Sequence, residues 1–144
     1  MKETLFRGKR EDNKEWVEGF YCKRKTGHYT GMRFAEKYKD CIIKEFSDGG
    51  IYFAEVYPET SCQCTGLTDK NIKKIFEEDI VKKDSDIGVV KFGKYGNGFH
   101  YGFYVQWVTC LNLRPELAFW NSRVECVGNI FDNPELLNKG DESE

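Results

Sequence analysis

The sequence lacks any apolar run near the roughly 20 residues that a membrane-spanning helix needs. Its first eight residues contain no apolar stretch that would form the core of a signal peptide. These two absences predict that the protein stays in the cytoplasm, where it is made, and has no membrane partner. Because the cytoplasm is reducing, we expect the six cysteines to be free thiols rather than disulfides.

Histidine is scarce, and the common catalytic motifs are missing. The only two histidines are His28 and His100, and no motif for nucleophilic or acid–base catalysis surrounds either of them. The sequence contains no P-loop, no glycine-rich dinucleotide fingerprint and no zinc-protease helix. We therefore predict that the protein is not an enzyme and uses no cofactor.

Two short clusters offer alternative chemistry. Cys62 and Cys64 could give two thiolates to zinc, but no second pair lies at ligand spacing, so packing thiols are favoured and we expect no bound metal. Glu77, Glu78 and Asp79 could bind a hard cation or act as acid and base. Since strand residues alternate between faces, at most Glu77 and Asp79 point together, and a turn acid that accepts backbone N–H groups explains Asp79 equally well.

Aromatic side chains make up 15% of the chain and hydrophobic ones 40%, which favours a packed interior built from strands. Residues 16–21 read as a strand, and residues 42–56 read as a hairpin around a turn at 47–50. The clearest pattern is the strand over residues 99–107. Its apolar residues alternate with period two, which places five of them on one core face and Tyr104 on the other. The five are Phe99, Tyr101, Phe103, Val105 and Trp107.

Residues 68–76 fit either a capped helix or a tight turn followed by a strand. Proline at 134 indicates a final helical turn. An acidic turn at 77–79 followed by the strand from Gly88 is typical of SH3-like barrels. We predict a mainly β fold in one compact unit, with three segments in order. They are an N-terminal β region (1–58), an SH3-like small barrel closed by a short C-terminal helical turn (59–137), and an acidic tail (138–144).

Three blocks of the chain carry a family resemblance. They are Phe6-Arg7-Gly8-Lys9-Arg10 leading to Trp16-Val17-Glu18-Gly19, then Val56-Tyr57-Pro58-Glu59-Thr60 through to Asp79-Ile80-Val81, and finally Val124-Glu125-Cys126-Val127-Gly128-Asn129 through to Leu136-Leu137. In this order they resemble the YopX family, small proteins encoded in bacterial genomes and their prophages. The resemblance implies a phage or mobile-element origin and homo-oligomerisation, and it carries over no established activity or functional residue.

The chain departs from similar proteins at a few positions. They usually have glycine where this chain has Ile72 and Glu78, and they do not have cysteine at both Cys62 and Cys64. Glycine after Asn71 would mark a turn, so the resemblance favours the turn-then-strand interpretation of residues 68–76. The β-branched Ile72 opposes it, because such a residue resists positive φ.

Charge is distributed unevenly although the net charge is only −2. Residues 21–44 carry a net +5 and residues 115–144 a net −5. If these blocks lie on opposite sides of a subunit, copies attract head to tail. Phe119 and Trp120 are then the best candidates for the apolar contact, and burial as an interior plug is the alternative. The leading hypothesis is a non-enzymatic interaction module that self-associates.

The alternative hypothesis is an accessory nucleic-acid-binding protein. Its candidate surface combines the basic residues of 21–44 with an exposed ring: Lys23, Arg24, Lys25, Arg33, Lys37, Lys39, Lys44 and Tyr104. The acidic overall balance argues against strong phosphate binding.

Overall fold

The computed structural model describes residues 5–45 and 47–142, without the side chains of residues 26, 28–30, 34–36 and 139–142. The chain divides into two compact units, Met1–Gln63 and Cys64–Glu144. We call them unit 1 and unit 2 and describe each by itself.

Unit 1 is an antiparallel sheet with strand order β4-β3-β2-β1. The first residues of β5 pair with β1, opposite Phe6 and Arg7. Its core is a small cluster of Val17, Ile42, Ala54 and Val56, against which Phe6, Tyr21 and Tyr52 pack. The elements are β1 (Phe6–Lys9), β2 (Trp16–Thr30), β3 (Arg33–Glu45), β4 (Ile51–Glu55), the 3-10 helix η1 (Pro58–Thr60) and the start of β5 (Cys62–Thr68).

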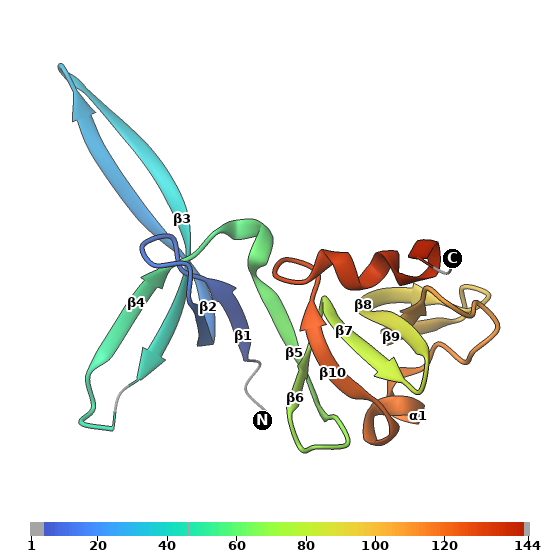
Figure 1. The fold of residues 1–144 in the computed structure, drawn as a ribbon. Helices are drawn as coiled ribbons and strands as arrows, with labels where there is room; N and C mark the ends of the chain where they lie inside the picture. Colours follow the sequence, from blue (N-terminus) through green and yellow to red (C-terminus); the bar gives the residue numbers. More distant parts are fainter. Residues whose placement is uncertain (1–4, 46, 143–144) are drawn as a thin grey trace. The chain divides into compact units, whose positions relative to one another are not determined.

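Strands β2 and β3 extend past their neighbours as a two-stranded ribbon (Figure 1). The neighbouring strands reach only part of the ladder, because β1 pairs with residues 16–19 of β2 and β4 with residues 41–45 of β3. The ribbon ends in a two-residue turn, where Gly31 has φ 65° and the side chain of Met32 is fully exposed. Glycine at the first turn position allows the positive φ of a tight hairpin turn. The backbone twist of such a turn matches that of the strands. We call residues 23–39 the arm.

Unit 2 is built on a second antiparallel sheet with strand order β10-β7-β8-β9. The end of β5 pairs with β6 beside it. Nine buried side chains form the core, among them Ile75, Val90, Trp107 and Leu117. The elements are β6 (Lys74–Phe76), β7 (Asp79–Lys83), β8 (Asp86–Tyr95), β9 (His100–Trp107), α1 (Leu117–Trp120), η2 (Asn121–Arg123), β10 (Glu125–Asn129) and η3 (Pro134–Glu142).

The prediction of a mainly β protein is confirmed, but the SH3-like barrel is not, because the four-stranded sheet of unit 2 stays open. Irregular segments, instead of strands, take up the edges where a barrel would close. The N–H of Val105 in β9 donates to the Pro115 carbonyl at 2.6 Å, and Tyr104 forms a bridge with Glu116. Next to β10, the N–H of Lys70 donates to the Val124 carbonyl at 2.9 Å.

The predicted core row of residues 99–107 is only half correct. Val105 and Trp107 are buried, and Phe103 packs against the core. Phe99 is 87% exposed and Tyr101 69% exposed, so their placement in the core was wrong. They lie at the tip of the β8–β9 hairpin, which has the period-two pattern but extends past the core that would cover it.

Residues 68–76 form a turn and then strand β6, so the helix alternative was wrong. Ile72 and Glu78, the two positions where the family resemblance implies glycine, adopt φ 64° and 71°. The left-handed region is favourable for glycine and strained for a β-branched side chain. The helical turn predicted at Pro134 is present as η3, while residues 143–144 of the predicted tail lie outside the described residues.

The substitution Ile72→Gly should therefore stabilise unit 2. The Ile72 side chain is 77% exposed, so little apolar burial is lost. Relief of the left-handed strain should raise the free energy of unfolding by about 1 kcal/mol, measured by urea denaturation. Ile72→Ala is the matched control and should gain less, because alanine keeps its Cβ. A loss of stability in Ile72→Gly would contradict the strain argument.

Candidate nucleic-acid interface

The arm concentrates positive charge in a narrow ribbon. Its 17 residues contain six basic side chains against one acid, Glu36. Because side chains alternate along each strand, residues directly opposite in the ladder share a face. Arg24 lies opposite Lys39. On the same face of β3, Lys37 lies two residues closer to the turn, and Arg33 ends the row at the turn. We call these four residues the basic face.

The other face of the arm has balanced charge at its root. Lys23 lies directly opposite Asp40, and Lys25 lies opposite Tyr38. The Tyr21 hydroxyl donates to Asp40 Oδ2 at 2.8 Å. Burial and then this hydrogen bond raise the pKa of Tyr21 to about 12. The hydroxyl therefore keeps its proton at neutral pH and fixes the Asp40 carboxylate where the arm leaves the sheet.

Two contacts hold the root of the basic face. Lys39 Nζ lies 3.3 Å from Glu11 Oε1, and the Arg24 guanidinium lies 5.1 Å from the centre of the Phe53 ring. Arg24 and Lys39 are nevertheless like charges directly opposite each other, an arrangement that costs stability in an antiparallel pair. Acidic side chains reach the root of this face, where Glu11, Asp12 and Glu55 line a hollow together with Arg24. Arg33 and Lys37 lie further out, toward the turn.

The dimensions of the arm suit a nucleic-acid groove. At roughly 3.3 Å per residue, its eight residues of β2 span about 26 Å. The major groove of B-DNA is about 12 Å wide and admits a two-stranded ribbon. Cations along such a ribbon are placed to contact the phosphates on either side.

Two of the eight predicted nucleic-acid residues lie outside the arm. Lys44 is exposed on β3, in the part of the strand that pairs with β4. Tyr104 belongs to unit 2, where its half-buried ring stacks on Tyr95 at 5.3 Å between centroids. The structure therefore brings together only the six residues between Lys23 and Lys39.

The predicted interface pair Phe119 and Trp120 sits against the core of unit 2. Trp120 is 9% exposed, and its indole N–H donates to the Arg114 carbonyl at 2.7 Å. Its ring is therefore not available for contact between copies, and the interior alternative fits it better. Phe119 is half-buried, with the guanidinium groups of Arg114 and Arg123 each 4.4 Å from its ring centre.

Buried acids and a thiol form a second polar cluster in unit 2. Asp69 accepts three backbone N–H groups, from Asn71 and Lys73 on Oδ1 and from Cys126 on Oδ2. Burial opposes ionisation, but these hydrogen bonds outweigh it and lower the pKa of Asp69. Asp79 accepts the N–H of Phe76 at 2.8 Å, as expected for a turn acid, and the Cys126 Sγ lies 3.7 Å from its Oδ2.

The chemistry of this cluster is structural. Burial, and then the carboxylates of Asp79 and Asp69, raise the pKa of the Cys126 thiol, which keeps it protonated and a poor nucleophile. All six cysteines are free thiols, and Cys62 is buried. Among the described residues, no three His, Cys, Asp or Glu side chains gather as metal ligands would. The described helices also include none long and apolar enough to cross a membrane.

Two sheets, one with a projecting basic ribbon, define a small β protein with a candidate polyanion-binding surface. The chain belongs to the YopX family, whose description "YopX protein" matches residues 5–138. This confirms the resemblance seen in the three sequence blocks. Among solved structures, protein EF1440 from Enterococcus faecalis is similar, with 23% identity over 95% of this chain and 99% of that chain, and a TM-score of 0.45. No curated protein matches the chain.

Sequence reasoning identified the basic residues but missed the ribbon that arranges them. The available signal was Gly31, which lies in a polar stretch with segments of similar length on either side. Such a position suits a two-residue turn. It also missed a hollow in unit 2 formed by Tyr95, His100, Arg114 and Glu116. These residues are separated in sequence, and no motif joins them.

Substitution of Asp69 by asparagine should destabilise the protein in a pH-dependent way. One of the three N–H groups loses its acceptor, at a cost of about 1–3 kcal/mol near pH 7. Because the folded pKa is lowered, the stabilisation by Asp69 is present above its ordinary value of 3.8 and is lost as the pH falls through the folded pKa. The gap between wild type and variant in urea unfolding should therefore stay constant above about pH 5 and shrink as the pH falls through the folded pKa.

The exposed carboxylate of Asp84, whose Oδ2 lies 3.1 Å from Lys83 Nζ, provides the control. Asp84→Asn should change the free energy of unfolding by less than about 0.5 kcal/mol. Equal effects of the two substitutions at neutral pH would show that Asp69 does not organise the turn.

Proposed function

We propose that this YopX-family protein acts by binding rather than by catalysis, and that it contacts the phosphate backbone of nucleic acid through the basic face of its arm. The observation that carries the proposal is the placement of Arg24, Arg33, Lys37 and Lys39 on one face of a projecting two-stranded ribbon. Such a ribbon offers its cations to a groove without requiring the rest of the protein to be basic.

The acidic overall balance does not oppose this reading. The arm carries +5 while the whole chain carries −2, so the remaining residues sum to −7. Interactions between exposed charges are screened beyond about 8 Å at physiological salt. Since the arm extends beyond its neighbouring strands, phosphates bound near its tip experience mainly the charge of the arm.

The groups that would otherwise serve catalysis support a binding role. The Cys126 thiol is held protonated, and the carboxylates of Asp69 and Asp79 accept backbone N–H groups. We also propose, from the family, that the protein originates in phage or another mobile element, where accessory binding proteins of this size are expected.

The test is the salt dependence of duplex binding. Wild-type protein should bind a labelled duplex of about 20 base pairs, and log K should fall with log salt with a slope of about −0.9 for each phosphate contacted. The double substitution Arg33→Gln and Lys37→Gln should reduce the magnitude of that slope by about 2, measured by fluorescence anisotropy.

The arm supplies its own matched control. Lys23→Gln with Lys25→Gln removes the same charge from the same ribbon but from the opposite face. It should change the slope much less. Absence of duplex binding by the wild type at low salt, or equal effects of the two double substitutions, would refute the proposal. Circular dichroism on each variant checks that the fold is unchanged.

Self-association is the second candidate, and it is favoured by the face of the unit 1 sheet that lies opposite the core. Phe20, Ile43 and Phe53 are directly opposite one another on β2, β3 and β4, which places them in one row on one face. Phe20 is 37% exposed, Phe53 44% and the neighbouring Ile51 64%. We infer that a second copy covers this row, with the opposite charge blocks at residues 21–44 and 115–144 adding attraction.

Light scattering tests self-association directly. The double substitution Ile51→Ser and Phe53→Ser should shift a concentration-dependent oligomer to monomer, and the apolar contact should persist in high salt, which screens only the charge pairs. Leu111→Ser, at an apolar residue of unit 2 that is 83% exposed, is the control and should have no effect. A wild-type monomer at every concentration would rule this candidate out.

A further inference from the structure

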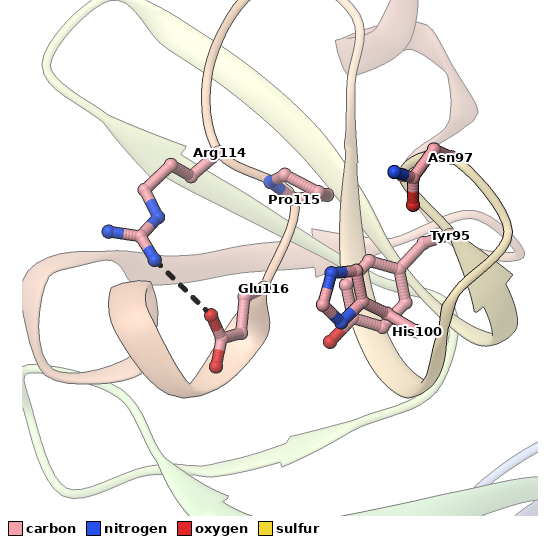
Figure 2. Close-up of a pocket in the computed structure, with 7 residues that line it drawn as sticks. Tyr95, Asn97, His100, Arg114, Pro115 and Glu116 are labelled. Carbon is pink, nitrogen blue, oxygen red and sulfur yellow. Dashed lines mark ion pairs between the residues drawn. The ribbon is translucent and has the colours of Figure 1, made fainter.

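A hollow of about 370 Å³ lies in unit 2, between the tip of the β8–β9 hairpin and the segment Arg114–Glu116. Figure 2 shows its two walls, with the stacked rings of Tyr95 and His100 on one side and the charged pair Arg114 and Glu116 on the other. Asn97 lies at the hairpin tip and Pro115 between the charged residues. The volume is within the range of small-ligand sites, roughly 300–1,000 Å³.

The aromatic wall is a short row of stacked rings. Tyr95 lies opposite His100 in the ladder, and their rings are 5.3 Å apart with an angle of 19° between the planes. Tyr104 continues the row, 5.3 Å from Tyr95 at 29°. His100 is exposed whereas Tyr95 and Tyr104 are half-buried. The row therefore has an accessible end at which a further flat ring can stack.

The charged wall is held in place by the backbone. The Arg114 carbonyl accepts the indole N–H groups of Trp107 at 2.9 Å and Trp120 at 2.7 Å. Next to it, the Pro115 carbonyl accepts the N–H of Val105 at 2.6 Å. This explains why a segment without regular structure keeps a fixed position beside the rings.

The side chains of the charged wall remain accessible. Arg114 Nη2 lies 3.5 Å from Glu116 Oε1, with the side chains 63% and 47% exposed. The guanidinium also lies 4.4 Å from the centre of the Phe119 ring, which orients it. An exposed ion pair contributes little net stability, so a ligand can exchange with it at low cost.

We infer that this hollow binds a guanine base. A flat ring stacks on the accessible end of the row, and its edge meets an arginine beside a glutamate. Guanine presents along one edge a carbonyl acceptor followed by two N–H donors, which complements the N–H donors of Arg114 and the two acceptor oxygens of Glu116. Adenine and cytosine lack an N–H donor next to a carbonyl acceptor, and uracil presents an acceptor in place of the second donor. Only guanine therefore satisfies Arg114 and both oxygens of Glu116.

The base reaches the site either as a free nucleotide or as an unpaired residue of a strand. The site is separate from the arm and does not depend on the proposed function. Duplex binding by the arm involves no unpaired base, and binding of a mononucleotide does not require the arm. The two proposals can therefore fail independently.

The experiment titrates the 144-residue chain with GMP, AMP, CMP and UMP. Binding is measured from the shifts of the backbone amides in NMR. GMP should bind most tightly and shift the amides of residues 95–100, 114 and 116. His100→Ala removes the stacking surface and should weaken GMP binding by at least about tenfold. Glu116→Gln removes one acceptor and should abolish the preference for GMP over AMP. Tyr101→Ala, on an exposed ring of the same hairpin but of the opposite face, is the control and should change neither.

A second titration separates the two sources of the base. A short single strand with one guanine is compared with GMP, on wild type and on the arm variant Arg33→Gln with Lys37→Gln. Equal affinity of strand and GMP assigns the site to a free nucleotide, and tighter strand binding that survives the arm substitutions assigns it to an unpaired base. The inference is overturned if all four mononucleotides bind equally, or if neither ligand is weakened by His100→Ala and Glu116→Gln.

Discussion

The long ladder between β2 and β3 is the constraint on which unit 1 depends. One end of it lies in the sheet, where Ile42 enters the core and Tyr21 packs against it, and the other end runs outward as the arm. The continuous backbone hydrogen bonds let the chain carry charged residues away from the core without interrupting the sheet. The Tyr21–Asp40 hydrogen bond marks the transition, because a half-buried ring that packs on the core meets the first charge of the arm there.

The alternation of side chains between the two faces of a strand decides which residues share an accessible surface in this protein. On the arm, alternation separates four cations from a face on which Lys23 lies opposite Asp40. On the β8–β9 hairpin, the same alternation places the Tyr95 and His100 rings on the face opposite Phe103 and Val105. In both cases a two-stranded ribbon extends beyond its core and leaves side chains of one kind accessible to a ligand.

The elements whose signal is local were predictable from the sequence. The hairpin around residues 47–50, the helical turn at Pro134 and the strand ending at Trp107 follow from turn chemistry and periodicity. The exposure of Phe99 and the burial of Trp120 were not predictable, because both depend on where the core ends and not on the local pattern. Glycine preferences at 72 and 78 did carry information, since both positions have positive φ in spite of their Ile and Glu side chains.

The central claim is that nucleic acid contacts the arm, and amide shift mapping with a short duplex tests it most directly. The account predicts that the largest shifts fall on residues 24, 33, 37 and 39 and their neighbours on the basic face, with the unit 1 core and unit 2 little changed. Shifts that spare the arm, or that concentrate in unit 2, would contradict it.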